Sequence, residues 1–297
     1  MPTRDALQPR RLPARLLLAS RPLSWVNTAY PFGAAYLLGG GGVDALFVVG
    51  CLFFLVPYNL AMYGINDVFD YASDAVNPRK GGDEGALLPP RTHRAVLVAA
   101  IAACVPFVVA LAVLGTPVSW LVLAVSLIAV AAYSVPPLRF KEVPVLDSIT
   151  SSTHFVSPAV YGLVAAGAAG NAQAVLALAA FFLWGMASHA FGAVQDVVPD
   201  RAGGIRSIAT ALGAARTVRL ALALWALAGL LVALLPFPAM LLAVVAVPYL
   251  ALAWPYRSVS DAASASANRG WRRFLLVNYL AGFATTLVLI ANALGAR

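Results

Sequence analysis

The sequence contains few charged residues. Only 11% of its 297 residues are Asp, Glu, Lys or Arg, whereas 61% are hydrophobic. A soluble domain carries about 25% charged residues, and the mean hydropathy of +0.84 is high for such a domain. The composition therefore excludes an ordinary soluble domain and predicts an integral membrane protein.

The sequence also lacks the residues that several kinds of site need. Its two cysteines, Cys51 and Cys104, both lie within apolar runs, which predicts small buried hydrophobic residues and neither a disulfide nor a zinc site. No glycine-rich loop follows a predicted strand, so nucleotide hydrolysis finds no support. We expect no nucleic-acid partner, because no soluble basic domain accompanies the net charge of +8.

Long apolar stretches recur along the chain, most of them close to the length of about 20 residues that a membrane-spanning helix needs. They are continuously apolar and do not alternate, which predicts helices and not a β-barrel. We therefore expect an all-α fold, a polytopic membrane helix bundle in a single domain of residues 1–297, whose basic segment 1–20 leads into an uncleaved anchor. The nine expected spans are Leu23–Leu38, Ala45–Ile65, Ala95–Leu114, Ser119–Tyr133, Ile149–Ala166, Ala172–Val194, Val218–Leu235, Met240–Trp254 and Phe274–Leu294.

The basic residues mark one side of the expected bundle. Loops near residues 39–44, 115–117, 167–171 and 236–238 contain no Lys or Arg, whereas the loops at the opposite ends of the spans are basic. Basic loops remain in the cytoplasm. This pattern predicts a multi-pass protein of the cell membrane with a cytoplasmic N-terminus, cytoplasmic acidic motifs and an external C-terminus.

Two acidic motifs stand at the ends of apolar spans on the basic side. In the first, Asn66, Asp70 and Asp74 are four residues apart, and Asp196 and Asp200 repeat this step 130 positions beyond Asn66 and Asp70. Side chains at i and i+4 share one helix face. Carboxylates as near to one another as these repel unless cations lie between them. Hard divalent ions prefer oxygen ligands and are suited to that position. The spacing therefore predicts a metal and diphosphate site.

Basic residues follow these motifs in loops that also contain glycine or proline. Such cations can neutralise a departing diphosphate through charge-assisted hydrogen bonds. Two of them lie in a turn that begins Pro136-Pro137, which predicts a stiff backbone there. The residues expected to bind the diphosphate are Arg79, Lys80, Arg139, Lys141 and Arg206.

These features resemble the UbiA superfamily of intramembrane prenyltransferases. The resemblance rests on the paired motifs, the nine spans and the segment Tyr133–Lys141, which reads Tyr-Ser-Val-Pro-Pro-Leu-Arg-Phe-Lys. It implies that Mg²⁺ ions at both motifs bind an isoprenyl diphosphate, and that the acceptor enters from the membrane lipid. The metal ligands it implies are Asn66, Asp67, Asp70, Asp74, Asp196 and Asp200, of which Asp70, Asp74, Asp196 and Asp200 are also the expected catalytic residues.

The second motif departs from the pattern of that superfamily at one position. Many members have a further acid four residues before the residue that corresponds to Asp196, where this chain has Gly192. The departure puts a symmetric set of ligands in doubt, and either Gln195 or a water molecule could take the place of the missing acid.

Shorter stretches resemble the lycopene elongase branch of the superfamily, which acts in actinobacterial carotenoid pathways. They are residues 21–31, 61–71, 77–82, 151–155 and 184–188. This resemblance implies dimethylallyl diphosphate as donor and lycopene as acceptor, with C45 and C50 carotenoids as products and pathway enzymes as possible partners.

The chemistry constrains the acceptor independently. Ionisation of an allylic diphosphate leaves a carbocation that must be shielded from water, and a bundle within lipid supplies a dry cavity. The second to sixth expected spans contain no Asp, Glu or Lys that could deprotonate a phenol or a hydroxyl, which favours an alkene as nucleophile. The residues expected to stabilise or quench the cation are Tyr63, Tyr71, Tyr133, Tyr161 and His189.

Two other functions fit parts of the pattern. A related prenyltransferase could use an aromatic acceptor, as in quinone or haem pathways, or a glycerophosphate. An ion-coupled transporter would use intramembrane carboxylates to move cations, but here the acids lie at helix ends beside basic loops and no inverted repeat is evident.

Overall fold

The computed structural model describes residues 11–76 and 87–295, and all regular secondary structure in these two ranges is helical. The chain divides into two compact units, each with its own core. Unit 1 consists of Met1–Phe140 and His154–Ala169, and unit 2 of Lys141–Thr153 and Gly170–Arg297. The expectation of an all-α helix bundle is confirmed. The expectation of a single domain stays a prediction.

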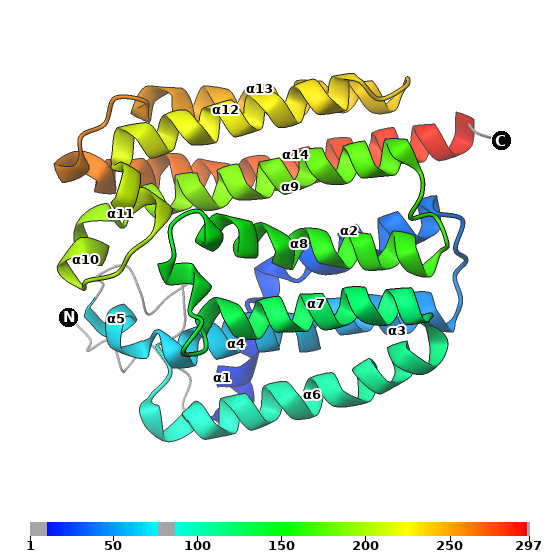
Figure 1. Ribbon diagram of the computed structural model, residues 1–297, viewed down its shortest axis with the longest axis horizontal. Coiled ribbons are helices and arrows are strands. Elements are labelled where there is room, and N and C mark those ends of the chain that lie inside the picture. Colours follow the sequence, from blue (N-terminus) through cyan, green and yellow to red (C-terminus); the bar gives the residue numbers. More distant parts are fainter. Residues whose placement is uncertain (1–10, 77–86, 296–297) are drawn as a thin grey trace. The chain divides into compact units, whose positions relative to one another are not determined.

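Unit 1 is built from helices that pack around a core of aromatic side chains. Phe53 and Phe54 lie at its centre, with ring centroids 4.9 Å apart, and Tyr58 and Tyr161 each lie 5.9 Å or less from one or both of them. In Figure 1 the connection between α6 and α7 lies at the end of unit 1 opposite α5. The helices are α1 (Leu12–Ala19), α2 (Val26–Leu38), α3 (Ala45–Leu55), α4 (Pro57–Phe69), α5 (Tyr71–Val76), α6 (His93–Leu114) and α7 (Pro117–Ser134).

The second expected span, Ala45–Ile65, lies within the single segment Ala45–Phe69, which is long and apolar enough to cross a membrane and is interrupted at Val56, between α3 and α4. Pro57 is the first residue of α4 and has no N–H to continue the hydrogen bonding of α3. Near this interruption the carbonyl of Phe54, in the last turn of α3, accepts hydrogen bonds from Asn59 Nδ2 (2.8 Å) and Thr28 Oγ1 (2.6 Å). Polar side chains thus satisfy the backbone where the helix breaks, as a lipid-embedded segment requires.

Unit 2 packs its helices around a second aromatic core. Trp225 stacks on Tyr249 with ring centroids 5.6 Å apart, and Phe191 and Phe274 pack against Trp225. In Figure 1 the short helices α10 and α11 lie together at one end of the long helices of this unit. The α-helices are α9 (Ala172–Val194), α10 (Val197–Ala202), α11 (Ile208–Leu212), α12 (Ala214–Ala233), α13 (Ala246–Ala253) and α14 (Asn268–Gly295).

Helix α8 (Leu146–Ala165) begins in unit 2 and ends in unit 1. It starts three residues before the expected span, so it includes Asp147, which is completely buried. The expectation that the second to sixth spans contain no acid is therefore wrong for this helix. The expected start of this span was placed after Asp147 because hydropathy falls at that residue. In the structure the helix includes Asp147, because its carboxylate accepts hydrogen bonds from backbone N–H groups within the protein.

Seven helical segments of the described ranges are long and apolar enough to cross a membrane. They are Ala45–Phe69, Pro90–Leu114, Pro117–Ser134, Ala172–Val194, Ala214–Ala233, Ala239–Tyr256 and Asp261–Leu294. Two further expected spans are helical but fall outside this set. Helix α2 has 13 residues, and α8 carries many polar side chains, among them Asp147, Ser148, Ser152 and His154. The protein is a multi-pass membrane protein, with nine as an approximate number of spans.

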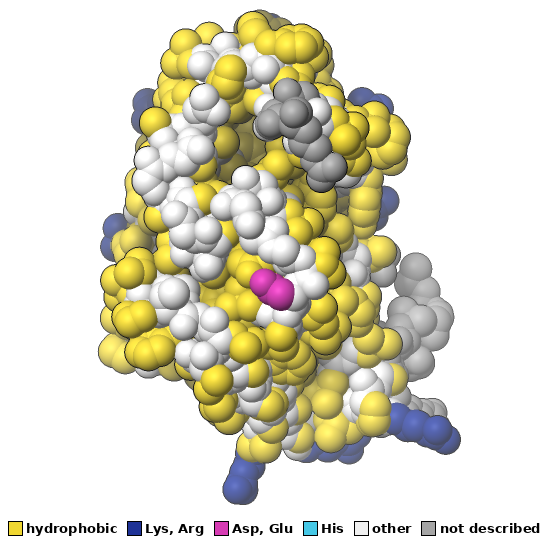
Figure 2. All heavy atoms as spheres, turned by 90° about the vertical axis from the view of Figure 1, so that its right-hand side faces the viewer, with side chains coloured by type: hydrophobic (Ala, Val, Ile, Leu, Met, Phe, Trp, Pro, Cys, Tyr) yellow, Lys and Arg dark blue, Asp and Glu magenta, His cyan; other side chains and the backbone are white. Residues whose placement is uncertain are grey.

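The outer surfaces of the long helices are hydrophobic. Large apolar side chains with more than half of their surface exposed include Val98 and Ile101 on α6 and Leu276 and Phe283 on α14. Lipid hydrocarbon is the environment that these outer surfaces match. Figure 2 instead looks onto the helix ends at the right of Figure 1, where hydrophobic side chains are also frequent and the Lys and Arg side chains in view lie at the margins.

Candidate active site

The first acidic motif lies at the junction of α4 and α5. The backbone N–H of Asp70 donates to the carbonyl of Asn66 (2.9 Å), and that of Asp74 donates to the carbonyl of Asp70 (2.8 Å), so the expected four-residue steps are present. Asn66 Nδ2 donates to Asp70 Oδ2 at 2.7 Å and to Ser134 Oγ at 3.1 Å. Asp70 and Asp74 are each 8% exposed. The amide of Asn66 therefore orients one carboxylate in a nearly closed setting.

Asp67 faces a cation of the same unit. Arg21 Nη2 lies 2.9 Å from Asp67 Oδ1, and its guanidinium carbon is 4.3 Å from the centroid of the Tyr63 ring. Burial lowers the pKa of Arg21, but the charges of Asp67, Tyr63 and Asp74 outweigh it and leave that pKa above its usual value. Sequence reasoning missed Arg21 as a site residue, because it stands 46 positions from Asp67 among basic residues that also serve as topology signals.

The proline-containing turn after α7 supplies one cation to each unit. Arg139 Nη2 lies 3.9 Å from Asp70 Oδ1, so in unit 1 this arginine accompanies the first motif. In unit 2, burial lowers the pKa of Lys141 to about 8, against the opposing influence of the Glu142 and Asp200 carboxylates. Burying a lysine in this way costs free energy, so the lysine beside an acidic motif is a candidate for binding an anion.

The second motif joins α9 to α10. The N–H of Asp200 donates to the carbonyl of Asp196 at 2.9 Å, which confirms the expected four-residue step here as well. Both side chains are partly exposed, and Asp196 occupies the N-cap position of α10. The second pair of acids is therefore less enclosed than Asp70 and Asp74.

An aromatic ring explains why residue 192 is a glycine and not an acid. A Cβ at this position would lie 2.9 Å from Cζ3 of Trp271, which is closer than carbon atoms approach. Trp271 in turn stacks on Phe274 with ring centroids 4.8 Å apart. The side chain of Gln195 is already engaged, since its Nε2 donates to the Gly192 carbonyl (2.9 Å) and its Oε1 accepts from Asn268 Nδ2 (2.6 Å). Trp271 thus occupies the space that a further acid would need.

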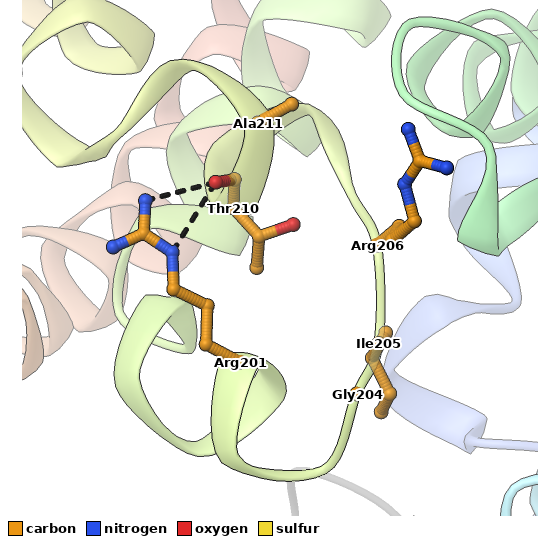
Figure 3. Close-up of a pocket in the computed structure, with 6 residues that line it drawn as sticks. All are labelled: Arg201, Gly204, Ile205, Arg206, Thr210 and Ala211. Carbon is orange, nitrogen blue, oxygen red and sulfur yellow. Dashed lines mark hydrogen bonds between the residues drawn. The ribbon is translucent and has the colours of Figure 1, made fainter.

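Residues in the segment 201–211, which follows the second motif, line a pocket of about 290 Å³ (Figure 3). Arg201 turns towards Thr210, whose carbonyl accepts hydrogen bonds from its Nε (3.3 Å) and Nη2 (2.8 Å), and it also pairs with Asp261. Arg206 lies on the other side of the loop, with its guanidinium pointing away from Arg201. Arg206 is exposed and so is accessible to an anion, and its expected role in binding the diphosphate stays a prediction.

The remaining expected residues have varied surroundings. Arg79 and Lys80 lie outside the described residues. Tyr71 packs edge-on against His93 and Tyr133 against His154, each with ring centroids 5.2 Å apart. Tyr161 is completely buried and donates to the carbonyl of Leu111, near the end of α6 opposite His93. His189 Nδ1 lies 3.0 Å from Ser148 Oγ in unit 2.

The chain matches the model of the UbiA prenyltransferase family over residues 28–289. The chain belongs to this family. It is 52% identical over 276 residues to the lycopene elongase/hydratase of Corynebacterium glutamicum, an alignment that covers 93% of this chain and 96% of the relative. It is also 53% identical over 280 residues to the C(50) beta-cyclic carotenoids biosynthesis protein LbtBC of Dietzia sp., covering 94% of this chain and 65% of that one.

A solved structure shares the fold of this prenyltransferase. It is a UbiA homologue from Archaeoglobus fulgidus bound to DMAPP and Mg²⁺, with a TM-score of 0.63 and 19% identity over 90% of this chain and 98% of that one. The family and fold expected from the two acidic motifs and the nine spans are confirmed.

The first motif of this UbiA prenyltransferase suits a hard cation in its donor chemistry. Among residues 11–76 and 87–295, no three His, Cys, Asp or Glu side chains form a group that could hold a metal ion by themselves. Mg²⁺ needs no such cage, because it is commonly held by one or two carboxylates together with substrate phosphates and water. The carboxylates of Asp70 and Asp74, one helical step apart, fit that requirement.

Proposed function

We propose that this membrane prenyltransferase is a lycopene elongase, which transfers dimethylallyl groups from dimethylallyl diphosphate to the ends of lycopene and forms C45 and C50 carotenoids. The observation that carries the proposal is the 52% identity to a lycopene elongase/hydratase along 96% of that protein's length. Identity at this level without a large insertion or deletion supports a shared substrate as well as a shared fold.

The acidic motifs are the proposed Mg²⁺ and diphosphate site, with Asn66, Asp67, Asp70, Asp74, Asp196 and Asp200 as ligands. Bound Mg²⁺ would stabilise the negative charge of the departing diphosphate. The proximity of Arg139 to Asp70 supports a role for this arginine at the same diphosphate. The partly buried Lys141 and the exposed Arg206 are the corresponding cations of unit 2, and Arg79 and Lys80 complete the proposed set.

In this proposal the main role of Asp67 differs from that of Asp70 and Asp74. Its carboxylate oxygen Oδ1 is engaged by Arg21, so Asp67 holds that guanidinium close to the motif and reaches a metal ion only through its second oxygen. Arg21 would then add a fixed positive charge beside the diphosphate, which charge-assisted hydrogen bonds favour.

The acceptor is proposed to react as an alkene. The terminal double bond of lycopene attacks the allylic carbon as the diphosphate departs, and a tertiary cation remains on the acceptor. Aromatic faces stabilise such a cation, which supports roles for Tyr71 and Tyr133. For Tyr63, on whose ring the Arg21 guanidinium is stacked, and for the fully buried Tyr161 the role stays a prediction. A carotenoid would enter from the lipid, because the outer surfaces of the helices are apolar.

The protein is proposed to lie in the cell membrane with its N-terminus and both acidic motifs on the cytoplasmic side. The basic residues that follow the motifs support this orientation, because Lys and Arg near span ends are retained in the cytoplasm. Single cysteines introduced at Asp44 and at Arg206 in a variant without Cys51 and Cys104 test it. An impermeant thiol reagent applied to intact cells should label the first and spare the second.

Expression in cells that accumulate lycopene tests the function. The pigments should become heavier by one and then two C5 units, and purified enzyme should make the same products from lycopene, dimethylallyl diphosphate and Mg²⁺. An enzyme that leaves lycopene unchanged and prenylates a hydroxybenzoate, a naphthoate or a glycerophosphate would overturn the choice of acceptor. Proton-coupled ion flux in proteoliposomes, without any prenylated product, would indicate a transporter instead.

A further inference from the structure

A buried chain of polar groups in unit 2 joins the first turn of α8 to α9. It runs from the carboxylate of Asp147 through the hydroxyl of Ser148 to the imidazole of His189. Ser148 Oγ lies 3.3 Å from Asp147 Oδ1 and 3.0 Å from His189 Nδ1. Asp147 and Ser148 are completely buried, whereas His189 is partly accessible.

The hydrogen bonds of these groups are compatible with a tautomer of His189 in which Ser148 Oγ donates to Asp147 and accepts from the imidazole. As a carboxylate, Asp147 accepts hydrogen bonds and cannot donate one, and Oδ1 is within reach of the single hydrogen of Ser148 Oγ. With its hydrogen directed to Asp147, the hydroxyl presents a lone pair to His189 Nδ1. An imidazole in this arrangement carries its proton on Nδ1 and donates it to Ser148 Oγ, which leaves the lone pair on Nε2.

The carboxylate of this chain is itself held firmly in place. Asp147 Oδ2 accepts from the backbone N–H of Ile208 at 2.6 Å, and Oδ1 accepts from the N–H of Ser148 at 2.7 Å. Asp147 thus ties α8 to the segment that follows the second acidic motif. A fixed negative charge two hydrogen bonds from the ring stabilises an imidazolium if His189 takes up a proton.

We propose that His189 is the proton acceptor that ends each prenyl transfer, and that Ser148 and Asp147 are positioning residues that hold its ring with Nε2 unprotonated. The inference rests on the proposed lycopene elongation. After the new carbon–carbon bond forms, a C–H bond next to the tertiary cation breaks and its electron pair forms a C=C bond. The proton passes to Nε2 and then to water, while the diphosphate keeps the electron pair of its former C–O bond.

The alternative fate of the cation makes the proposal measurable. Without a base, the cation is captured by water, and the product is an alcohol that is heavier than the alkene by one water molecule. The ratio of alkene to alcohol therefore reports on His189, whereas total diphosphate release reports on the metal site. A purely structural role for His189 would lower both products together and leave their ratio unchanged.

The chain offers a matched control for Ser148. Ser152 lies one turn further along α8, is completely buried as well, and donates to the carbonyl of Phe182 in α9 at 2.7 Å. Ser152→Ala removes a buried hydrogen bond between the same two helices without touching the imidazole. It should leave the product ratio as in the wild type.

The experiment supplies lycopene, dimethylallyl diphosphate and Mg²⁺ to purified wild type, His189→Gln, Ser148→Ala and Ser152→Ala. In His189→Gln, alkene formation should fall about 100-fold, at the lower end of the range for positioned acid–base groups, with a smaller loss of diphosphate release and a lower alkene-to-alcohol ratio. Ser148→Ala should change the ratio in the same direction by less. An unchanged ratio in both variants, or an equal change in Ser152→Ala, would overturn the proposal.

A second measurement concerns the tautomer and does not depend on turnover. Nitrogen-15 NMR of the three histidines, assigned by the loss of one signal in His189→Gln, should show Nε2 of His189 unprotonated in the wild type and a mixture of tautomers in Ser148→Ala. A His189 protonated on Nε2 would overturn the proposal. Wild-type enzyme that leaves lycopene unchanged would overturn the proposed function and this inference together, whereas an unaltered ratio in active His189→Gln enzyme would overturn this inference alone.

Discussion

The two acidic motifs share one spacing and differ in their surroundings. In the first, Asp70 is 8% exposed, accepts a hydrogen bond from Asn66 and lies 3.9 Å from Arg139. In the second motif, Asp196 and Asp200 are partly exposed. Four residues before Asp196, one helical turn earlier, the chain has Gly192, which lies against the ring of Trp271. The repeated spacing therefore does not imply two equivalent metal sites.

The difference has a physical consequence for binding a charged ligand. Charges held in place by neighbouring groups and shielded from water interact strongly with a ligand, because little reorganisation is needed when it binds. Partly exposed carboxylates are screened by water and are less restricted. We therefore expect the first motif to contribute more to turnover than the second, and substitutions in the two motifs to differ in size.

The largest effect is expected for Asp70→Asn. The amide keeps the size of the carboxylate but removes its charge, and loss of one fixed electrostatic group costs about 10²–10³-fold in turnover. Turnover is measured with purified enzyme at saturating Mg²⁺. Asp44→Asn is the matched control, because Asp44 caps α3 by accepting from Phe47 N–H at 2.9 Å and belongs to neither motif. Equal activity of Asp70→Asn and wild type would contradict a metal site here.

Removal of Mg²⁺ with a chelator should abolish turnover in every variant, and re-addition of Mg²⁺ should restore it.

A smaller effect is expected for Asp200→Asn. Because its carboxylate is partly exposed, Asp200→Asn should lower turnover by about tenfold, the size expected for loss of about 1.4 kcal/mol of stabilisation. It should also need a higher Mg²⁺ concentration for half-maximal activity. A loss as large as that of Asp70→Asn would mean that the two motifs contribute equally.

The sequence predicted those features that depend on neighbouring residues in the chain. Apolar runs predicted the helices because a membrane span must bury its backbone within one segment, and the four-residue steps of both motifs followed from helix geometry. The break at Pro57 was missed. A proline within an apolar run can kink a helix or divide it, and here the interruption is accompanied by buried hydrogen bonds from Thr28 and Asn59 to the carbonyl of Phe54.

Features that depend on distant residues could not be predicted. Arg21 and Asp67 are 46 positions apart, and Asp147 and His189 are brought together through Ser148 by the packing of α8 against α9. The reason for Gly192 was also hidden, because Trp271 is 79 positions away in the sequence. In each case the sequence contained the residue type, but only the fold showed its partner.

A further difference between the motifs is the cation that accompanies each, which is Arg139 at the first and Lys141 at the second. Burial lowers the pKa of Lys141 to about 8, so this lysine loses its charge as the pH rises through that value. Above pH of about 8, each pH unit lowers the charged fraction of Lys141 about tenfold. The Michaelis constant for dimethylallyl diphosphate should therefore rise several-fold between about pH 7 and 9 in the wild type.

Lys141→Arg is the control for this pH dependence. An arginine at this position stays charged, so the rise in the Michaelis constant should be smaller than in the wild type. Ionisation of the diphosphate itself affects both enzymes equally and cancels in the comparison. Identical pH profiles of the two enzymes would mean that Lys141 does not bind the diphosphate.

The smallest effect on turnover is expected at Gly192, where the comparison of the two motifs can be tested directly. Gly192→Ala places a Cβ 2.9 Å from the Trp271 ring, which must shift away from its stacking on Phe274. Overfilling of this kind costs about 1–3 kcal/mol, so the midpoint of thermal unfolding should fall while turnover per folded molecule changes little. Gly282→Ala in α14 is the control, because nothing lies within 4 Å of the Cβ it would add. In the background of Trp271→Leu, Gly192→Ala should lower the unfolding midpoint by less than it does in the wild type, because the smaller side chain leaves room for the methyl group. If Gly192→Ala is instead as stable as Gly282→Ala, the ring of Trp271 does not fill this position. Lack of space would then not explain why the second motif has no acid at position 192.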